Sequence, residues 1–185
     1  MRLIALVGAL LVMAAAPAQA AWHQYINQQA GFGVDVPADP TMSKSTYKTG
    51  IAGTVDSTIY TTDERGVTFS IIVVDFSNRL LETASLLQEA IYINTLNQDI
   101  VSDDLARAEP GQRAVYGRRI SVNQKDGSRT TRVLFLTKGK LYIFEAKVPK
   151  GGDFGSPSSG RFIDSVVFNI EPGAGAPAAP GAPQQ

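Results

Sequence analysis

The sequence predicts an α+β fold built on a mainly antiparallel β-sheet. Three observations predict it. Most regularly patterned segments are short and either alternate or are rich in β-branched residues; turn residues separate neighbouring segments; only one long segment has helical spacing. With 185 residues, 44% of them hydrophobic and 18% charged, the composition is typical of an ordinary globular domain.

The first half of the predicted domain consists of short extended segments that end at glycine, proline or a turn. Gly31 separates the first two, and Pro37 closes the second. The last of these segments, VTFSIIVVDF, is apolar on both faces at its centre, so we expect a buried central strand. The expected strands are residues 22–27, 32–36, 43–49, 56–62 and 67–76, with a hairpin turn at residues 63–66.

Residues 80–98 carry the one clear long helical pattern. One face of this helix is expected to hold Leu80, Ala84, Leu87 and Ile91. Ser77 or Asn78 is the expected N-cap. The polar residues that follow are expected to be a connection without regular structure.

The second half of the predicted domain is a meander followed by a short helix. Asp126-Gly127 and Lys138-Gly139 supply its turns. Residues 133–136 and 141–144 are apolar at consecutive positions, so both faces of the sheet are expected to be covered there. The expected elements are strands at about residues 113–123, 129–138 and 140–148, a helix at 156–164 capped by Ser156, and a last strand at 165–170.

The two ends of the chain differ from this domain. Residues 1–20 combine Arg2, an apolar run and the small-residue site Ala18-Gln19-Ala20, which predicts a secretory signal peptide cleaved near Ala20. No run reaches the roughly 20 apolar residues that span a bilayer. Residues 171–185, rich in Pro, Ala and Gly, are predicted to be a disordered tail. Residues 21–170 are therefore expected to be one periplasmic or secreted, non-membrane-spanning domain.

Several chemistries are excluded or weakly supported. The chain has no cysteine, which excludes disulfides and thiolate metal sites, and its single histidine, His23, excludes multi-histidine sites. A Ser-His-Asp triad would have to use His23. The segment GSPSSG at residues 155–160 lacks the Gly-x-Ser-x-Gly pattern, and Asp103-Asp104 is expected to be a solvated turn. We therefore expect no enzymatic activity, no metal and no cofactor.

Charge is segregated along the chain. Residues 21–104 contain 4 Lys and Arg against 11 Asp and Glu, whereas residues 105–150 contain 11 against 3. Two interpretations stay open: the acidic half folds against the basic strands and neutralises them, or these strands present a basic surface to an anionic partner. The residues expected to bind a partner in the second case are Arg118, Arg119, Arg129 and Arg132. Nucleic acid is not expected, because no aromatic platform accompanies the charge.

Short motifs spread over residues 22–170 resemble those of PsbP-like domains. They are Trp22-x-x-Tyr25, Gly31-Phe32-x-Val34-x-Val36-Pro37-x-x-Pro40, Val73-Val74-Asp75, Gly117-Arg118, Arg132, Gly139-Lys140-Leu141-Tyr142 and Arg161-Phe162-x-Asp164-Ser165-Val166-x-Phe168. The resemblance implies an α/β/α sandwich with helices packed on both faces of an antiparallel sheet. Family members include an extrinsic subunit of the oxygen-evolving complex and a nuclear-import factor, so the resemblance also implies non-enzymatic binding or assembly.

The expected function is that of a binding or accessory protein, a monomer that docks on an envelope protein or complex. The alternative is a periplasmic carrier of a small apolar or anionic ligand, held between the sheet and the helix at residues 80–98. Aromatic side chains on the strands would line such a pocket.

Overall fold

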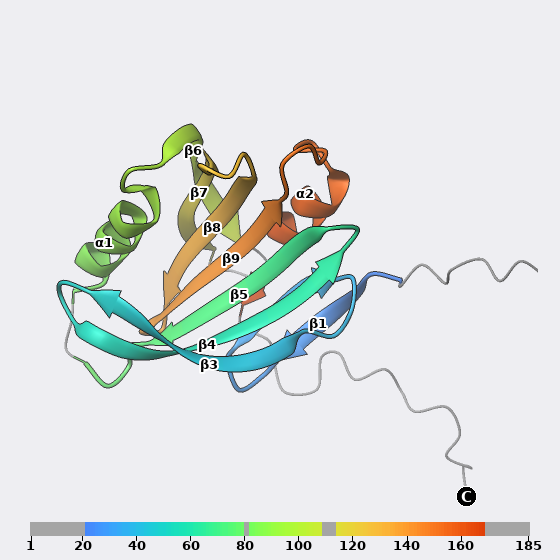
Figure 1. Ribbon diagram of the computed structural model, residues 1–185. Coiled ribbons are helices and arrows are strands. Elements are labelled where there is room, and N and C mark those ends of the chain that lie inside the picture. Colours follow the sequence, from blue (N-terminus) through green and yellow to red (C-terminus); the bar gives the residue numbers. More distant parts are fainter. Residues whose placement is uncertain (1–20, 80–81, 109–113, 169–185) are drawn as a thin grey trace, which may run out of the picture.

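Two antiparallel sheets and two helices make up the computed structural model, which describes residues 21–79, 82–108 and 114–168 (Figure 1). The larger sheet has seven strands in the order β3-β4-β5-β9-β8-β7-β6, and the smaller has the order β1-β2-β10. A mainly antiparallel α+β fold is thus confirmed. The elements are β1 (His23–Asn27), β2 (Phe32–Val36), β3 (Thr41–Thr49), β4 (Gly53–Glu64), β5 (Val67–Asp75), α1 (Thr83–Thr95), β6 (Asp99–Ala108), β7 (Val115–Asn123), β8 (Arg129–Thr137), β9 (Lys140–Val148), α2 (Pro157–Asp164) and β10 (Val167–Phe168).

Tight hairpin turns set the order of the large sheet. Arg65 and Gly66 join β4 to β5, and Lys138 and Gly139 join β8 to β9. All four residues have positive φ, between 50° and 82°. Two consecutive positive φ angles give the turn whose twist matches that of the flanking strands, so the register of each hairpin is fixed locally. The turn residues at these positions confirm both hairpins that the sequence predicts.

The large sheet is buried on both faces, because successive residues of a strand point to opposite sides. On one side, which we call the α2 face, Phe69 and Phe144 pack with Phe32 of β2 and Phe162 of α2. On the other side, the α1 face, Leu134 and Ile143 pack with Leu86 and Ala90 of α1. The α2 face is covered largely by the small sheet, with the short helix α2 beside it, so the helices on both faces that the PsbP-like resemblance implies are not confirmed.

The helix α1 is shorter than expected. It begins at Thr83 and its N-cap is Glu82, whose side chain accepts from Ser85 Oγ but from no backbone N–H group of the first turn, so the expectation of Ser77 or Asn78 was wrong. Leu86 and Ala90 are its buried residues, whereas Leu80 lies outside the described residues. The expectation of an irregular connection after the helix was also wrong, since these residues form β6 at the edge of the sheet.

Other expectations fall outside the described part of the chain. These are the signal peptide at residues 1–20, the tail at residues 171–185 and the end of the last strand at residues 169–170. Within the described residues, no helix has the length and apolar character needed to cross a membrane.

Candidate docking surfaces

An exposed apolar stripe runs along the outer side of α1. Tyr92, Ile93 and Leu96 carry it, and Tyr92 keeps 61% of its surface exposed. Glu89, Tyr92 and Ile93 follow the spacing i, i+3 and i+4, which places them on one side of α1, and Leu96 at i+7 is the C-cap of the helix. From the sequence only one apolar face of this helix was expected, and Ile93 was expected to widen that face, whereas Ile93 is 38% exposed. The signal in the sequence is a second row of apolar residues on the same helix, in addition to the row that packs on the sheet.

The stripe continues onto the turn between β3 and β4. The Glu89 carboxylate accepts hydrogen bonds from the backbone N–H groups of Gly50 and Ile51, the latter at 3.3 Å. These bonds hold the turn beside α1, and Ile51 is itself 47% exposed. We call Ile51, Tyr92, Ile93 and Leu96 the α1 stripe. Exposed apolar side chains rimmed by polar groups are typical of protein-binding surfaces.

The four arginines expected to bind a partner do not share one surface. Arg118 is paired with Leu134 across β7 and β8, and Arg132 is paired with Ile120, so both lie on the α1 face. Arg119 is paired with Val133 and lies on the α2 face. Arg129 is paired with Val148 and lies on the α2 face as well. The four therefore divide into two pairs on opposite sides of the sheet.

On the α1 face, both arginines contact carboxylates. Arg118 Nε donates to Asp103 Oδ1 at 2.9 Å. Arg132 Nε donates to Glu145 Oε2 at 2.5 Å, and its Nη1 donates to the carbonyl oxygen of Asn94 in α1 at 3.3 Å. The side chains of Arg132 and Glu145 are only 15% and 20% exposed. Arg132 thus ties the last turn of α1 to the sheet.

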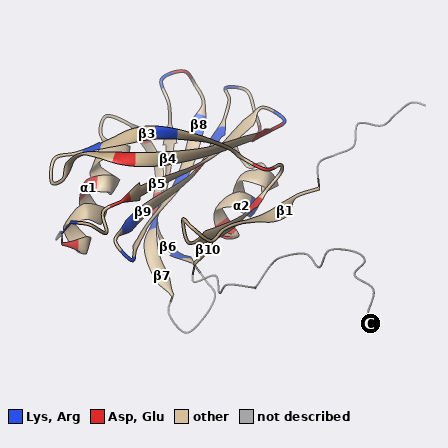
Figure 2. Cartoon of the chain, turned by 90° about the horizontal axis from the view of Figure 1, so that it is seen from below, with Lys and Arg blue, Asp and Glu red and all other residues tan. Residues whose placement is uncertain are grey.

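On the α2 face, the arginines contact the C-terminal part of the described chain. Arg119 forms an ion pair with Asp164 of α2. Arg129 donates to Asn123 Oδ1 at 3.0 Å, and its guanidinium lies 4.5 Å from the ring centroid of Phe154. Figure 2 shows acidic and basic residues spread over strands and helices alike. Ion pairing thus compensates three of the four charges, and their role in partner binding stays a prediction.

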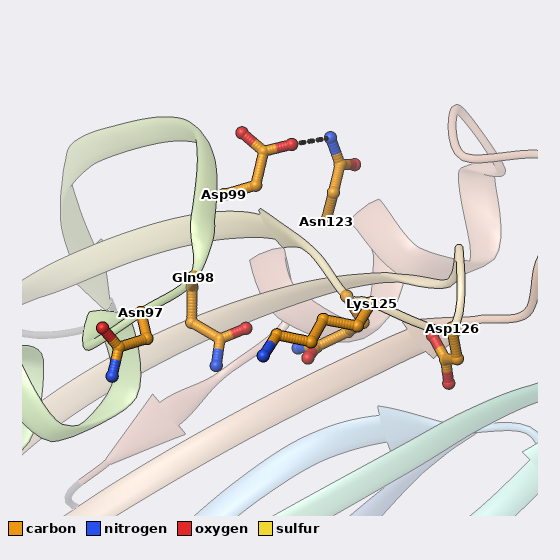
Figure 3. Close-up of a pocket in the computed structure, with 7 residues that line it drawn as sticks. Asn97, Gln98, Asp99, Asn123, Lys125 and Asp126 are labelled. Carbon is orange, nitrogen blue, oxygen red and sulfur yellow. Dashed lines mark hydrogen bonds between the residues drawn. The ribbon is translucent and has the colours of Figure 1, made fainter.

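A polar hollow of about 650 Å³ lies where the loop after α1 meets the β7–β8 hairpin (Figure 3). Asn97, Gln98 and Asp99 line one side, and Asn123 donates to Asp99 Oδ2 at 2.8 Å. Side-chain and backbone hydrogen bonds from Ser128 lower the pKa of Asp126 to about 2. Asp126 and Ser128 therefore bond within the β7–β8 turn, whereas Asp99 and Asn123 bond across β6 and β7.

A second hollow, of about 680 Å³, lies between the β1–β2 turn and the strands β3, β4 and β5. Lys44 and Lys140 line it together with apolar Met42 and Tyr60. Lys44 Nζ donates to Thr58 Oγ1 at 3.1 Å, and Lys140 Nζ lies 3.9 Å from Asp75 Oδ2. The expected pocket between the sheet and the helix differs from it, because the inner side of α1 is packed against Leu134 and Leu136.

The residues weighed for catalysis have structural contacts. His23 lies on β1 and is exposed, and its Nε2 lies 2.9 Å from Asp39 Oδ1. Ser158 Oγ donates to Glu64 Oε2 at 2.9 Å, beside the Trp22 indole that donates to Glu64 Oε1 at 3.1 Å. Within the described ranges, no three His, Cys, Asp or Glu residues gather as a metal site.

Comparisons with known proteins give a distant likeness. No protein-family model matches the chain, and no curated protein matches it. Among solved structures, the chain is similar to cyanobacterial PsbP from Synechocystis, with 16% identity and a TM-score of 0.40. The match covers 70% of this chain and 81% of that one.

Proposed function

We propose that this chain is a non-enzymatic accessory protein of the cell envelope, a PsbP-like domain that docks on a partner protein through the α1 stripe. The observation that supports the proposal is the exposed row Tyr92, Ile93 and Leu96, whose inner neighbours Leu86 and Ala90 already anchor the helix. Export rests on the residues of the predicted signal peptide. The partner is an envelope protein with an apolar patch of its own.

The geometry of the stripe supports protein binding for two reasons. Tyrosine offers a large apolar contact with a polar tip, and such residues often dominate interface energies. The contact of Glu89 with the β3–β4 turn holds Ile51 beside the helix, which reduces the ordering cost of binding. By contrast, Arg118, Arg119 and Arg132 already contact carboxylates, so an anionic partner would have to compete with them.

The test is a pull-down after crosslinking in cells that produce the protein naturally. We compare the wild type with Y92S/L96S and with the control M42S/V101S, which removes two exposed apolar side chains from other surfaces. Recovery of the partner should fall at least about tenfold in Y92S/L96S, equivalent to about 1.4 kcal/mol. It should persist in the control. Equal recovery from both variants would contradict docking through the α1 stripe. In the same experiment, R119E/R129E tests whether these arginines bind the partner.

A second candidate function is that of a ligand carrier, and the hollow beside Lys44 and Lys140 favours it. Two ammonium groups line the hollow beside Met42 and Tyr60, together with the carboxylates of Asp56 and Asp75. A small amphiphile would fit if its anionic group replaced Asp75 as the partner of Lys140. Native mass spectrometry of protein from its own cells tests this candidate. A retained small mass that K44E/K140E loses would support the carrier, and a bare polypeptide would contradict it.

A further inference from the structure

The strand β6 offers a second, separate surface at the edge of the seven-stranded sheet. Among the described residues it is paired on one side only, with β7. The register of that pairing shifts between Ile100 and Ser102, and from Ser102 to Ala108 it is regular. Such an edge presents backbone N–H and C=O groups that another strand can bind.

The middle of this edge is apolar. Leu105 is 80% exposed, more than any other large apolar side chain of the described residues, and Tyr116 on β7 is 66% exposed. Leu105 is paired with Arg118, and Tyr116 with Arg107, so Leu105 and Tyr116 are diagonal neighbours on the α1 face. Burying this pair would favour association.

The charges on either side of Leu105 are ordered so that β6 complements itself. Asp103, Leu105 and Arg107 alternate on the same face of the strand. A second β6 that runs antiparallel with Leu105 opposite Leu105 brings each Asp103, which also pairs with Arg118 of its own copy, opposite Arg107 of the other copy. On the opposite face, the same register places Asp104 opposite Ala106. Opposite charges across strands stabilise a sheet, and like charges destabilise it.

Neighbouring registers lack this complementarity. A pairing centred on Asp104 or on Asp103 sets a carboxylate directly opposite its own copy. A pairing centred on Ala106 sets Leu105 opposite Arg107 and separates the two leucines. The sequence of the edge therefore selects one register, the one centred on Leu105.

We propose that a second copy of this chain pairs antiparallel along β6, with Leu105 at the two-fold axis, and joins the two seven-stranded sheets into one. This proposal replaces the expectation of a monomer. It does not depend on the α1 stripe, which continues toward β3 and β4 at the opposite edge of the sheet. A dimer with no partner, or a partner with no dimer, would therefore separate the two proposals.

The absence of cysteine from the sequence allows a direct test of the register. Residues opposite each other in antiparallel strands have Cα atoms about 4.5–5.5 Å apart, within the range of about 4.4–6.8 Å for a disulfide. Under mild oxidation, L105C should therefore form a covalent dimer. The matched control I100C sits on the same strand, and its two copies would lie roughly 30 Å apart. Equal crosslinking of both variants would overturn the proposal.

A charge exchange tests the same register without a covalent bond. R107E places a second carboxylate opposite Asp103 of the other copy, and D103K places two cations opposite each other. Each variant alone should have the mass of a monomer by light scattering, while their mixture should form a heterodimer. A wild type that stays monomeric across the accessible concentrations, or a mixture that stays monomeric, would overturn the proposal. Far-ultraviolet circular dichroism confirms that each variant is folded.

Discussion

The hydroxyl of Tyr142 donates a hydrogen bond of 2.7 Å to the carbonyl oxygen of Ala30, and this buried bond joins the two sheets. Tyr142 lies on β9 at the centre of the large sheet, and Ala30 lies in the turn between β1 and β2 of the small one. The ring also packs against Phe168 of β10, with 4.9 Å between ring centroids. One side chain of the large sheet thus contacts both the β1–β2 turn and β10 of the small sheet.

Replacing Tyr142 by phenylalanine tests this contact. Y142F keeps the ring and leaves the carbonyl of Ala30 without its partner, so we expect a loss of about 1–2 kcal/mol in the free energy of unfolding. Urea denaturation measures it. Burial raises the pKa of Tyr142 to about 12, so the phenol stays protonated as a donor at neutral pH. An unchanged midpoint would show that the bond contributes nothing.

Gly117 is predicted to tolerate no side chain. A Cβ atom at this position would lie 2.6 Å from Cδ1 of Phe135 and would also meet the backbone oxygen of Leu134 on β8. Because backbone cannot give way as a flexible side chain does, G117A should part β7 from β8 and cost at least about 2 kcal/mol. G151A is the control, because a Cβ atom at Gly151 would meet no other atom and only the positive φ of 78° would be strained. Thermal unfolding measures the stability of both variants. If G117A were as stable as G151A, the prediction would be contradicted.

Arg132 should contribute more to stability than Arg118. R132Q leaves the half-buried Glu145 unpaired and removes a bond to the last turn of α1, so we expect a loss of about 2 kcal/mol. R118Q breaks a more exposed pair with Asp103 and should cost less than about 1 kcal/mol. Denaturant unfolding of both variants measures the difference. The reverse order would mean that the Arg132 contact does not hold α1.

The carboxyl group of Asp126 makes the stability of the fold depend on pH in the acidic range. Hydrogen bonds from Ser128 hold its pKa at about 2, below the ordinary value of 3.8. A carboxyl whose pKa is depressed by folding stabilises the fold above its ordinary pKa, and this contribution is lost as the pH falls from about 4 to about 2. NMR titration of the carboxyl carbon should give a midpoint near 2 in the wild type and a higher one in S128A. A wild-type midpoint near 3.8 would refute the assignment.

The local features of this fold follow from the sequence where turn residues and apolar alternation agree. The bounds of β2 match the expected residues 32–36, because Gly31 and Pro37 limit that strand on both sides. The strand β6 was missed because an edge strand needs no apolar alternation. Ala108 is the only buried residue of β6, and the backbone pairing with β7 is what defines this strand.

The division of the arginines was partly predictable. Arg118 and Arg119 are adjacent on an expected strand, and adjacent residues of a strand point to opposite faces. That Arg132 faces Asn94 and Glu145, and Arg129 faces Phe154, depends on strand order and register, which single-strand patterns do not determine. The α1 stripe likewise needed the structure, because only packing shows which apolar row of a helix is buried.

Site-specific photo-crosslinking in cells is the most direct test of docking through the α1 stripe. A photoreactive amino acid replaces Tyr92, and in a matched control it replaces the exposed Gln24 of β1, on the other side of the large sheet. The account predicts one dominant protein adduct from position 92 and none from position 24. The same adducts from both positions, or none from position 92, would contradict it.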